Sequence, residues 1–211
     1  MEVIFLDTID STHTYLKNYI KQNGFKNSIA VVTTNQTNGI GSRDNSWCGI
    51  KGNLFFSFVI SKTDLPEDLK LESASIYFSF LLKDILSEFG SQVWLKWPND
   101  FYIKDQKIGG TITTFHNELL FCGVGLNLYK VSPLYGALDM EIDINVLLEK
   151  YFQRIAETTP WKGIFSKFQI EFSSSKKFKT TINQEKVSLS DAILLEDGSL
   201  MIDNKKVYSS R

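Results

Sequence analysis

The sequence predicts an α+β fold, with a mixed and mostly antiparallel sheet, flanking helices and a small C-terminal β-barrel. Three observations point to it. Short apolar strand patterns alternate with helical patterns up to about residue 130, one long helical pattern is apolar across a wide face, and four short strand patterns separated by turn signals follow residue 176. We therefore expect a main domain over residues 1–175 and a small barrel over residues 176–211.

Length and composition describe an ordinary soluble protein. The 211 residues can bury a good core, and the net charge of -1, from 23 basic and 24 acidic side chains, argues against a surface built mainly for nucleic acid or anionic membrane. Cys48 and Cys122 show no metal-ligand spacing, so neither a disulfide framework nor a zinc site is indicated. Because no signal peptide or membrane-spanning run is visible, we expect a cytoplasmic protein.

The N-terminal part begins with a strand pattern at residues 3–6 and a helix pattern. Ser11 or Asp10 is a candidate N-cap, and Gly24 ends the helix. Apolar strands at residues 29–33 and 54–60 then enclose a long polar, glycine-bearing loop. Loops of this length in a compact domain are functional or disordered, and the flanking strands favour function.

The remaining elements follow the same patterns. Gly90 is placed to end the long core helix, and Asp143 to cap the helix after the central strands. Residues 173–177 have linker composition. The predicted helices cover residues 69–89, 143–155 and 161–172, and the predicted strands cover residues 93–97, 101–103, 107–110, 119–129, 180–182, 186–189, 192–196 and 200–202.

The hairpin over residues 94–110 combines apolar, basic and turn-forming residues. Gly109 and Gly110 in its last strand indicate a close approach of backbone to a neighbour or ligand. Lys107 could neutralise an anion there, although an isolated lysine after a turn more often lies in solvent. Lys96 alternates with apolar residues, so it faces either solvent or a pocket. Its neighbours Asn99 and Asp100 fit turn chemistry first.

Other motifs are weaker. Gly39 and Gly41 lack the third glycine of a dinucleotide fingerprint, so the loop offers backbone N–H groups and Arg43 to an anion, or is a solvated loop. His13 and His116 show neither metal spacing nor a nearby nucleophile. The acidic residues at 139, 141 and 143 fit a solvated helix entrance. The residues thus indicate an anion-handling pocket between the glycine loop, the hairpin and the strand ending at Asn127.

The string K-W-P-N-D at residues 96–100, followed by K-I-G-G at residues 107–110, closely resembles the signature of biotin protein ligases. Three further pieces stand in the family's order, namely D-S-T-H at residues 10–13, the loop at residues 39–47 and G-V-G-L-N at residues 123–127. The resemblance covers residues 1 to about 130 and, more loosely, the tail from Lys177 as the family's C-terminal barrel.

This resemblance implies a fold like the catalytic domain of class II aminoacyl-tRNA synthetases and a two-step ligation. Biotin and ATP, accompanied by Mg²⁺, would form biotinyl-5'-AMP. A lysine of a biotin carboxyl carrier protein, the carrier domain of acetyl-CoA or pyruvate carboxylase, would then take the biotin. Neither step needs an enzyme nucleophile, so catalysis would rest on positioning and electrostatics.

The resemblance also implies roles for individual residues. Lys107 and Arg43 would be catalytic, and no metal ligand is assigned. The ATP side would use Arg43, Trp47, Lys96, Asn99, Asp100 and Asn127. The biotin side would use Ser11, Thr12, His13, Gln36, Gly39, Ile40, Gly41, Ser42, Lys107, Gly109 and Gly110.

The sequence departs from the family's pattern in places. Ile40 and Ser42 stand where the family has arginine, and Arg43 is kept. Our hypothesis is that Arg43 partly replaces the lost arginines and that the adenylate is held less tightly. His13 stands where the family more often has asparagine. The family pattern begins at Met1, so we expect neither the DNA-binding domain of repressor members nor a nucleic-acid or membrane partner, while a monomer and a homodimer paired at a sheet edge both fit.

Two other functions compete with biotin ligation. One is a lipoate or octanoate protein ligase or transferase of the related fold, and the other is a non-catalytic biotin-binding module. The K-W-P-N-D hairpin favours biotin over lipoate. Lys107 and Gly110 argue against an inactive module.

Overall fold

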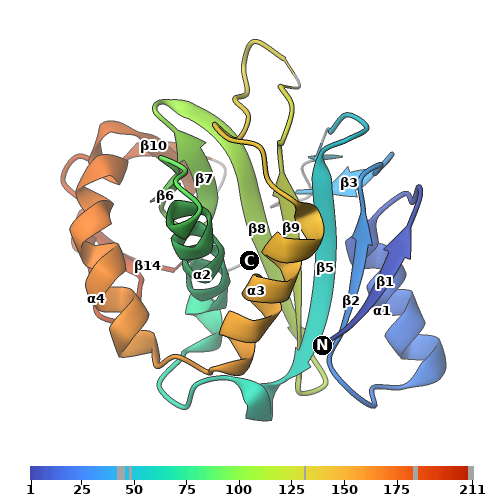
Figure 1. The fold of residues 1–211 in the computed structure, drawn as a ribbon. Helices are drawn as coiled ribbons and strands as arrows, with labels where there is room; N and C mark the ends of the chain where they lie inside the picture. The colour runs from blue at the N-terminus through green and yellow to red at the C-terminus, as the bar shows by residue number, and fades with distance from the viewer. Residues whose placement is uncertain (42–45, 48, 131, 183–184, 209–211) are drawn as a thin grey trace.

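The computed structural model describes residues 1–41, 46–47, 49–130, 132–182 and 185–208, with Ser46 described by its backbone alone. Its centre is a seven-stranded sheet in the order β1-β2-β5-β9-β8-β7-β6 (Figure 1). β1 and β2 pair in parallel and the other neighbours are antiparallel, which confirms the predicted mixed sheet. The strands are β1 (Glu2–Leu6), β2 (Ile29–Thr33), β5 (Leu54–Ser61), β6 (Trp94–Lys96), β7 (Asp100–Ile103), β8 (Gln106–His116) and β9 (Leu119–Leu126).

Helices cover both faces of this sheet. α2 (Ala74–Glu88), α3 (Ile144–Ala156) and α4 (Trp161–Glu171) lie on one side, and α1 (Thr12–Asn23) lies against β2, β5 and β9 on the other (Figure 1). Alternate side chains serve the two faces: Val32 and Phe58 join the core under α2, whereas Val31 and Val59 pack with Leu16 of α1. Burial on both faces explains why β2 and β5 read as mainly apolar runs, which Ser57 interrupts in β5.

The predicted helix ends are confirmed. Ser11 Oγ accepts the N–H of Thr14 at 3.3 Å, and Asp143 Oδ1 accepts the N–H of Asn145 at 2.8 Å. Gly24 and Gly90 follow their helices with φ of +74° and +102°, where only glycine is unstrained. The core helix starts later than predicted, because a 3-10 turn, η3 (Leu71–Ser73), precedes it.

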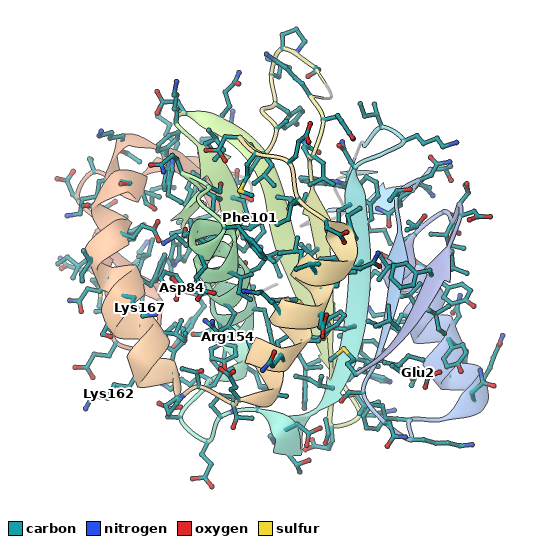
Figure 2. The ribbon with its side chains drawn as sticks, viewed as in Figure 1. Glu2, Asp84, Phe101, Arg154, Lys162 and Lys167 are labelled. Atoms are coloured by element: carbon teal, nitrogen blue, oxygen red, sulfur yellow. The ribbon has the colours of Figure 1, made fainter. Side chains whose placement is uncertain are left out.

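Side-chain pairs tie the three helices of the core face together. Lys167 Nζ of α4 lies 2.7 Å from Asp84 Oδ2 of α2, and the α3 residue Arg154 lies 2.8 Å from Glu88 of α2 through its Nη2 atom (Figure 2). Beneath them, Phe101 of β7 is fully buried in the core. The hairpin that carries the K-W-P-N-D motif is therefore packed from behind by this helical layer.

The prediction of a linker at residues 173–177 is wrong. This stretch belongs to the 3-10 helix η4 (Phe172–Lys177), in which Ser175 is fully buried. Its Oγ accepts the backbone N–H of Trp97 at 3.0 Å. Serine is common in solvated linkers, but the same hydroxyl can satisfy a buried donor, and composition does not distinguish the two cases.

The C-terminal strands form two small sheets. β10 (Lys179–Ile182) pairs with β11 (Glu185–Ser188), while β12 (Ile193–Leu194), β13 (Leu200–Ile202) and β14 (Lys205–Val207) form the second sheet. Among the described residues, the strands of the predicted C-terminal barrel are thus hydrogen-bonded as two small sheets. Phe178 joins them to the main sheet, since its ring lies 5.5 Å from the ring of Trp94 and 5.2 Å from that of Tyr102.

Asp197 lies in the turn between β12 and β13, and its carboxyl group makes the stability of the fold depend on pH. Burial alone would raise the pKa of its carboxyl group, but hydrogen bonds from Lys206, Ser199 and Lys70 outweigh burial and hold that pKa well below its usual range. A carboxyl group whose pKa is lower in the folded state stabilises the fold above its unfolded-state pKa. That contribution is lost as the pH falls through the folded-state pKa.

We therefore expect Asp197→Asn to lower the Tm at neutral pH by about 2–4 °C, the shift that roughly 1 kcal/mol causes in a chain of this size. The difference from the wild type should shrink steadily as the pH falls below about 4, where the carboxyl group of the unfolded chain becomes protonated. Thermal unfolding followed by circular dichroism across this range measures both effects. Asp203→Asn, on an exposed turn, is the control, and a Tm difference for Asp197→Asn that stayed constant with pH would contradict the assignment.

Candidate functional site

A pocket opens beside β8 and β9, where α1 begins and the loop before β5 passes. Two sets of polar residues line it, one from the start of α1 and its neighbours and the other from the K-W-P-N-D hairpin. The predicted site residues in its wall are Ser11, Thr12, His13, Gln36, Ile40, Gly41, Trp47, Asn99, Asp100, Lys107 and Gly110.

The first set is a network of hydroxyl and amide groups. Gln36 Oε1 accepts the N–H of Thr12 at 2.9 Å and its hydroxyl at 3.2 Å. The Thr12 Oγ1 also lies 2.9 Å from Ser57 Oγ on the neighbouring β5. His13 is buried next to them, with Nε2 3.3 Å from Thr114 Oγ1. The network is held in place by its own hydrogen bonds, so it presents a fixed polar surface to a ligand.

The second set concentrates charge. Asp100 Oδ1 lies 2.5 Å from Lys107 Nζ, and its Oδ2 lies 3.6 Å from Lys96 Nζ. Asn99 fixes the turn to β8, because its amide donates to the carbonyl of Thr111 and its own carbonyl accepts the Thr111 N–H at 3.0 Å. Two ammonium groups beside one carboxylate leave a local positive charge that attracts an anion.

A β-bulge determines which hairpin residues face the pocket. Tyr102 of β7 pairs with Lys107 and the adjacent Phe101 pairs with Gly109, so one extra residue, Ile108, shifts the alternation of β8. Strict alternation would put Lys107 and Gly109 on one face. With the bulge, Lys107 and Gly110 line the pocket together, and Gly109 does not.

The glycines around the pocket have different reasons to lack a side chain. A Cβ on Gly109 would lie 2.6 Å from the carbonyl oxygen of Gly125 on the paired strand β9, so its constraint is sheet packing. At Gly110 a Cβ would lie 3.3 Å from Asp100 Oδ1, inside the pocket. Gly39 lies outside the pocket lining, and a Cβ there would collide with the Gln36 amide nitrogen. Gly39 and Gly109 thus permit packing within the protein and lie outside the described pocket lining, and their contact with a ligand stays a prediction.

Trp47 forms part of the wall near Lys107. Its indole packs on Gly125 so closely that a Cβ there would lie 2.6 Å from Nε1, and Lys107 Nζ lies 5.4 Å from the ring centroid. Ile40, from the short strand β3 (Gly39–Ile40) that pairs with β4 (Ser46–Trp47), and Gly41 complete this side. The predicted roles of Ser42 and Arg43 concern residues outside the described part of the chain.

Two residues predicted for the nucleotide side lie behind the pocket wall. Lys96 is buried, 5.8 Å from the ring of Tyr102, and its Nζ lies 3.6 Å from the pocket residue Asp100. Asn127 is also buried, and its amide donates to the carbonyl of Gly136 and accepts from Asn53. Both positions suit residues that support the site from behind. The alternation of side chains along a strand does not distinguish such a residue from one that contacts a ligand.

The sequence reasoning missed some wall residues, chiefly Ser57, Thr111, Ile112, Gly123 and Val124. Ser57 had a usable signal, because it is a polar residue in the middle of an otherwise apolar strand and is fully buried. Such a position predicts a hydrogen-bonding partner across the sheet. The others are strand residues of β8 and β9, for which no residue type marked a pocket position.

The described residues offer few groups for covalent or metal chemistry. Cys122 is fully buried in the core, and burial raises the pKa of its thiol well above the usual value, which keeps it protonated. Within the described ranges, no group of three or more His, Cys, Asp or Glu side chains could hold a metal ion. None of the helices in these ranges is both long and apolar enough to cross a membrane.

The sheet, the helical layers and the pocket at the glycine-bearing strands give the class II aminoacyl-tRNA synthetase-like fold that the resemblance implied. The chain belongs to the biotin/lipoate A/B protein ligase family, whose sequence profile matches residues 5–127.

Solved structures extend the likeness to the C-terminus. Biotin acetyl coenzyme A carboxylase synthetase from Helicobacter pylori, solved with bound biotinylated ATP, is 41% identical and has a TM-score of 0.93, over 98% of this chain and 99% of that chain. The biotin protein ligase of Aquifex aeolicus, in complex with biotin and ATP, has a TM-score of 0.77 at 20% identity over 98% of this chain and 94% of that one, which shows the shared fold.

Curated relatives match over shorter regions. Biotin–protein ligase 2 of Arabidopsis thaliana is 33% identical over 108 residues, which are 46% of this chain and 32% of that protein. The bifunctional ligase/repressor BirA of Escherichia coli is 28% identical over 133 residues, which are 60% of this chain and 40% of that protein. The matched region thus spans less than half of each of these relatives.

Proposed function

We propose that this chain is an ATP-dependent biotin protein ligase. It forms biotinyl-5'-AMP from biotin and ATP, and then transfers the biotin to a lysine of a biotin carboxyl carrier protein. The observation that carries the proposal is one pocket that joins the Thr12–Gln36–Ser57 network to the Asp100–Lys107 pair. The Helicobacter pylori relative with bound biotinylated ATP supports it.

The polar network suits the ureido ring of biotin. That ring carries two N–H donors and one carbonyl acceptor, which match the hydroxyl oxygens of Thr12 and Ser57 and the amide of Gln36. The dithiolane ring of lipoate and the end of an octanoyl chain offer no such partners and would leave these buried groups without ligand bonds. A site built for hydrogen bonding rejects such analogues strongly.

Lys107 is the central group of the first step. A carboxylate oxygen of biotin forms a bond to the α-phosphorus of ATP, and the bond from that phosphorus to the pyrophosphate oxygen breaks. The two reactants are both anions, so their approach is repulsive unless a cation lies between them. The Lys107 ammonium, held by Asp100, reduces this repulsion and stabilises the charge that develops on the phosphate.

In the second step the amine of the acceptor lysine attacks the carbonyl carbon of the mixed anhydride. An amide bond forms, AMP leaves with the electron pair of the broken C–O bond, and the amine loses a proton. The enzyme holds the adenylate in one orientation and supplies no nucleophile of its own, so its contribution is orientation and electrostatics.

Magnesium would accompany ATP. Among the described residues the pocket offers one carboxylate, Asp100, so the ion would be held mainly by phosphate oxygens and water, as Mg²⁺ usually is. The acceptor would be the carrier domain of acetyl-CoA carboxylase or pyruvate carboxylase, and the reaction would take place in the cytoplasm.

Exchange of labelled pyrophosphate into ATP tests the proposal, because it reports adenylate formation alone. We expect exchange that depends on added biotin and is absent with lipoate or octanoate. Exchange with lipoate but not with biotin would identify a lipoate protein ligase instead. Exchange with neither compound would favour a non-catalytic biotin-binding module. Transfer of biotin to a carrier domain, with its acceptor lysine changed to arginine as control, then tests the second step.

A further inference from the structure

The turn at residues 196–199 connects the C-terminal sheets to three elements of the main domain. Its consecutive backbone carbonyls each accept a hydrogen bond from a side chain. The indole Nε1 of Trp161 donates to the carbonyl of Glu196 at 2.8 Å. Ser73 Oγ donates to the next carbonyl, and Trp97 Nε1 donates to the carbonyl of Gly198 at 2.8 Å. The turn therefore contacts the start of α4, the start of α2 and the K-W-P-N-D motif at once.

This turn is closed by its own hydrogen bonds. The N–H of Leu195 donates to Ser199 and the N–H of Gly198 donates to Leu195, each at 2.8 Å. Gly198 has a φ of +77°, and a Cβ there would lie 2.9 Å from Ile76 Cδ1 and 3.1 Å from the ring of Trp161. Position 198 therefore requires glycine, both for its conformation and for its packing.

Trp97 receives this contact inside the site's own hairpin. Its side chain is 1% exposed, and its backbone N–H donates to Ser175 of η4. Pro98, Asn99 and Asp100 follow it directly. Trp97 is thus fixed from two sides, and the pocket-lining residues Asn99 and Asp100 lie two and three residues further along the chain.

We propose that the turn at residues 196–199 is a positioning element of the ligation reaction, which acts through Trp97 on Asn99 and Asp100. This inference rests on the proposed function. The effect falls on the nucleotide side of the pocket, because Asn99 and Asp100 are the residues expected to serve ATP, while Thr12 and Gln36 are held by a separate network on α1 and the loop after β2. The C-terminal sheets are then part of the support of the active site.

The two tryptophans that donate hydrogen bonds to this turn provide a matched pair of variants. Trp97→Phe and Trp161→Phe each remove one buried indole donor of a 2.8 Å hydrogen bond to the same turn, but only Trp97 lies on the catalytic hairpin. We expect Trp97→Phe to raise the KM for ATP or lower kcat by about tenfold, at the modest end of what misplaced groups cost, with the KM for biotin unchanged. Trp161→Phe should keep both KM values and kcat within about twofold of the wild type.

Biotin-dependent pyrophosphate exchange, measured at varied ATP and at varied biotin, gives these constants. A general loss of stability would change both variants alike and would not separate ATP from biotin. Equal kinetic effects in the two variants, or an equal rise in both KM values of Trp97→Phe, would therefore overturn the inference.

If Trp97→Phe does not fold, Asp197→Asn decides the question, since it weakens the turn without touching the pocket. A rise in the KM for ATP alone supports the inference, and unchanged ATP kinetics overturns it. The wild type is measured first: a wild type without exchange overturns the proposed function together with this inference, whereas an active wild type with equal tryptophan variants overturns the inference alone.

Discussion

Replacing Lys107 with alanine is expected to lower biotin-dependent pyrophosphate exchange about 10²- to 10³-fold, the cost of losing one preorganised electrostatic group. The Lys107 ammonium lies 2.5 Å from Asp100 Oδ1. Without it, the carboxylate of Asp100 would face two anionic substrates with no cation at that oxygen. The loss should therefore appear in kcat/KM, and in kcat as well if Lys107 also stabilises the developing charge on the phosphate.

The variant should remain folded, because Lys107 is partly exposed and its removal leaves no large cavity in the core. Lys179→Ala is the control, since Lys179 is an exposed strand lysine of β10 outside the pocket. Thermal unfolding of both variants checks the fold. Exchange at the wild-type rate in Lys107→Ala would remove the central role that the proposed mechanism gives to this residue.

The sequence predicted those features of the fold that depend on local periodicity. The apolar runs of β2 and β5, the caps at Ser11 and Asp143, and the glycine after α1 follow from properties of neighbouring residues, and each is confirmed. The buried serine of η4 was missed because its partner, the N–H of Trp97, is distant in sequence. A hydrogen bond between residues distant in sequence determines that this serine is buried, and local composition does not predict such a bond.

The same distinction applies to the pocket. Motif resemblance brought Thr12, Gln36, Asp100 and Lys107 into one candidate site, and the structure gathers them around one pocket. Which of the two glycines faces the pocket depends on the bulge at Ile108, and glycine in a strand indicates a bulge or a close approach without saying which side it faces.

The two adjacent glycines make the consequence of the bulge measurable. A methyl group on Gly109 would lie 2.6 Å from the carbonyl of Gly125 and 3.0 Å from the ring of Phe101, so the paired strands would have to separate. We expect Gly109→Ala to lower the free energy of unfolding by about 1–3 kcal/mol, the usual cost of overpacking. Urea unfolding measures this loss, and Gly163→Ala, whose added Cβ would meet only Thr159 Cγ2 at 3.8 Å, is the control.

Gly110→Ala should behave in the opposite way. Its methyl group would lie 3.3 Å from Asp100 Oδ1 and 3.7 Å from Lys107 Cε, in space that the pocket leaves for a ligand. We expect a change in unfolding free energy below about 1 kcal/mol but a loss of about tenfold or more in kcat/KM for exchange, because the ligand and Lys107 can no longer take their joint position. If Gly109→Ala lost activity while keeping its stability, and Gly110→Ala lost stability while keeping its activity, then the strand would follow regular alternation and the bulge would not determine the site.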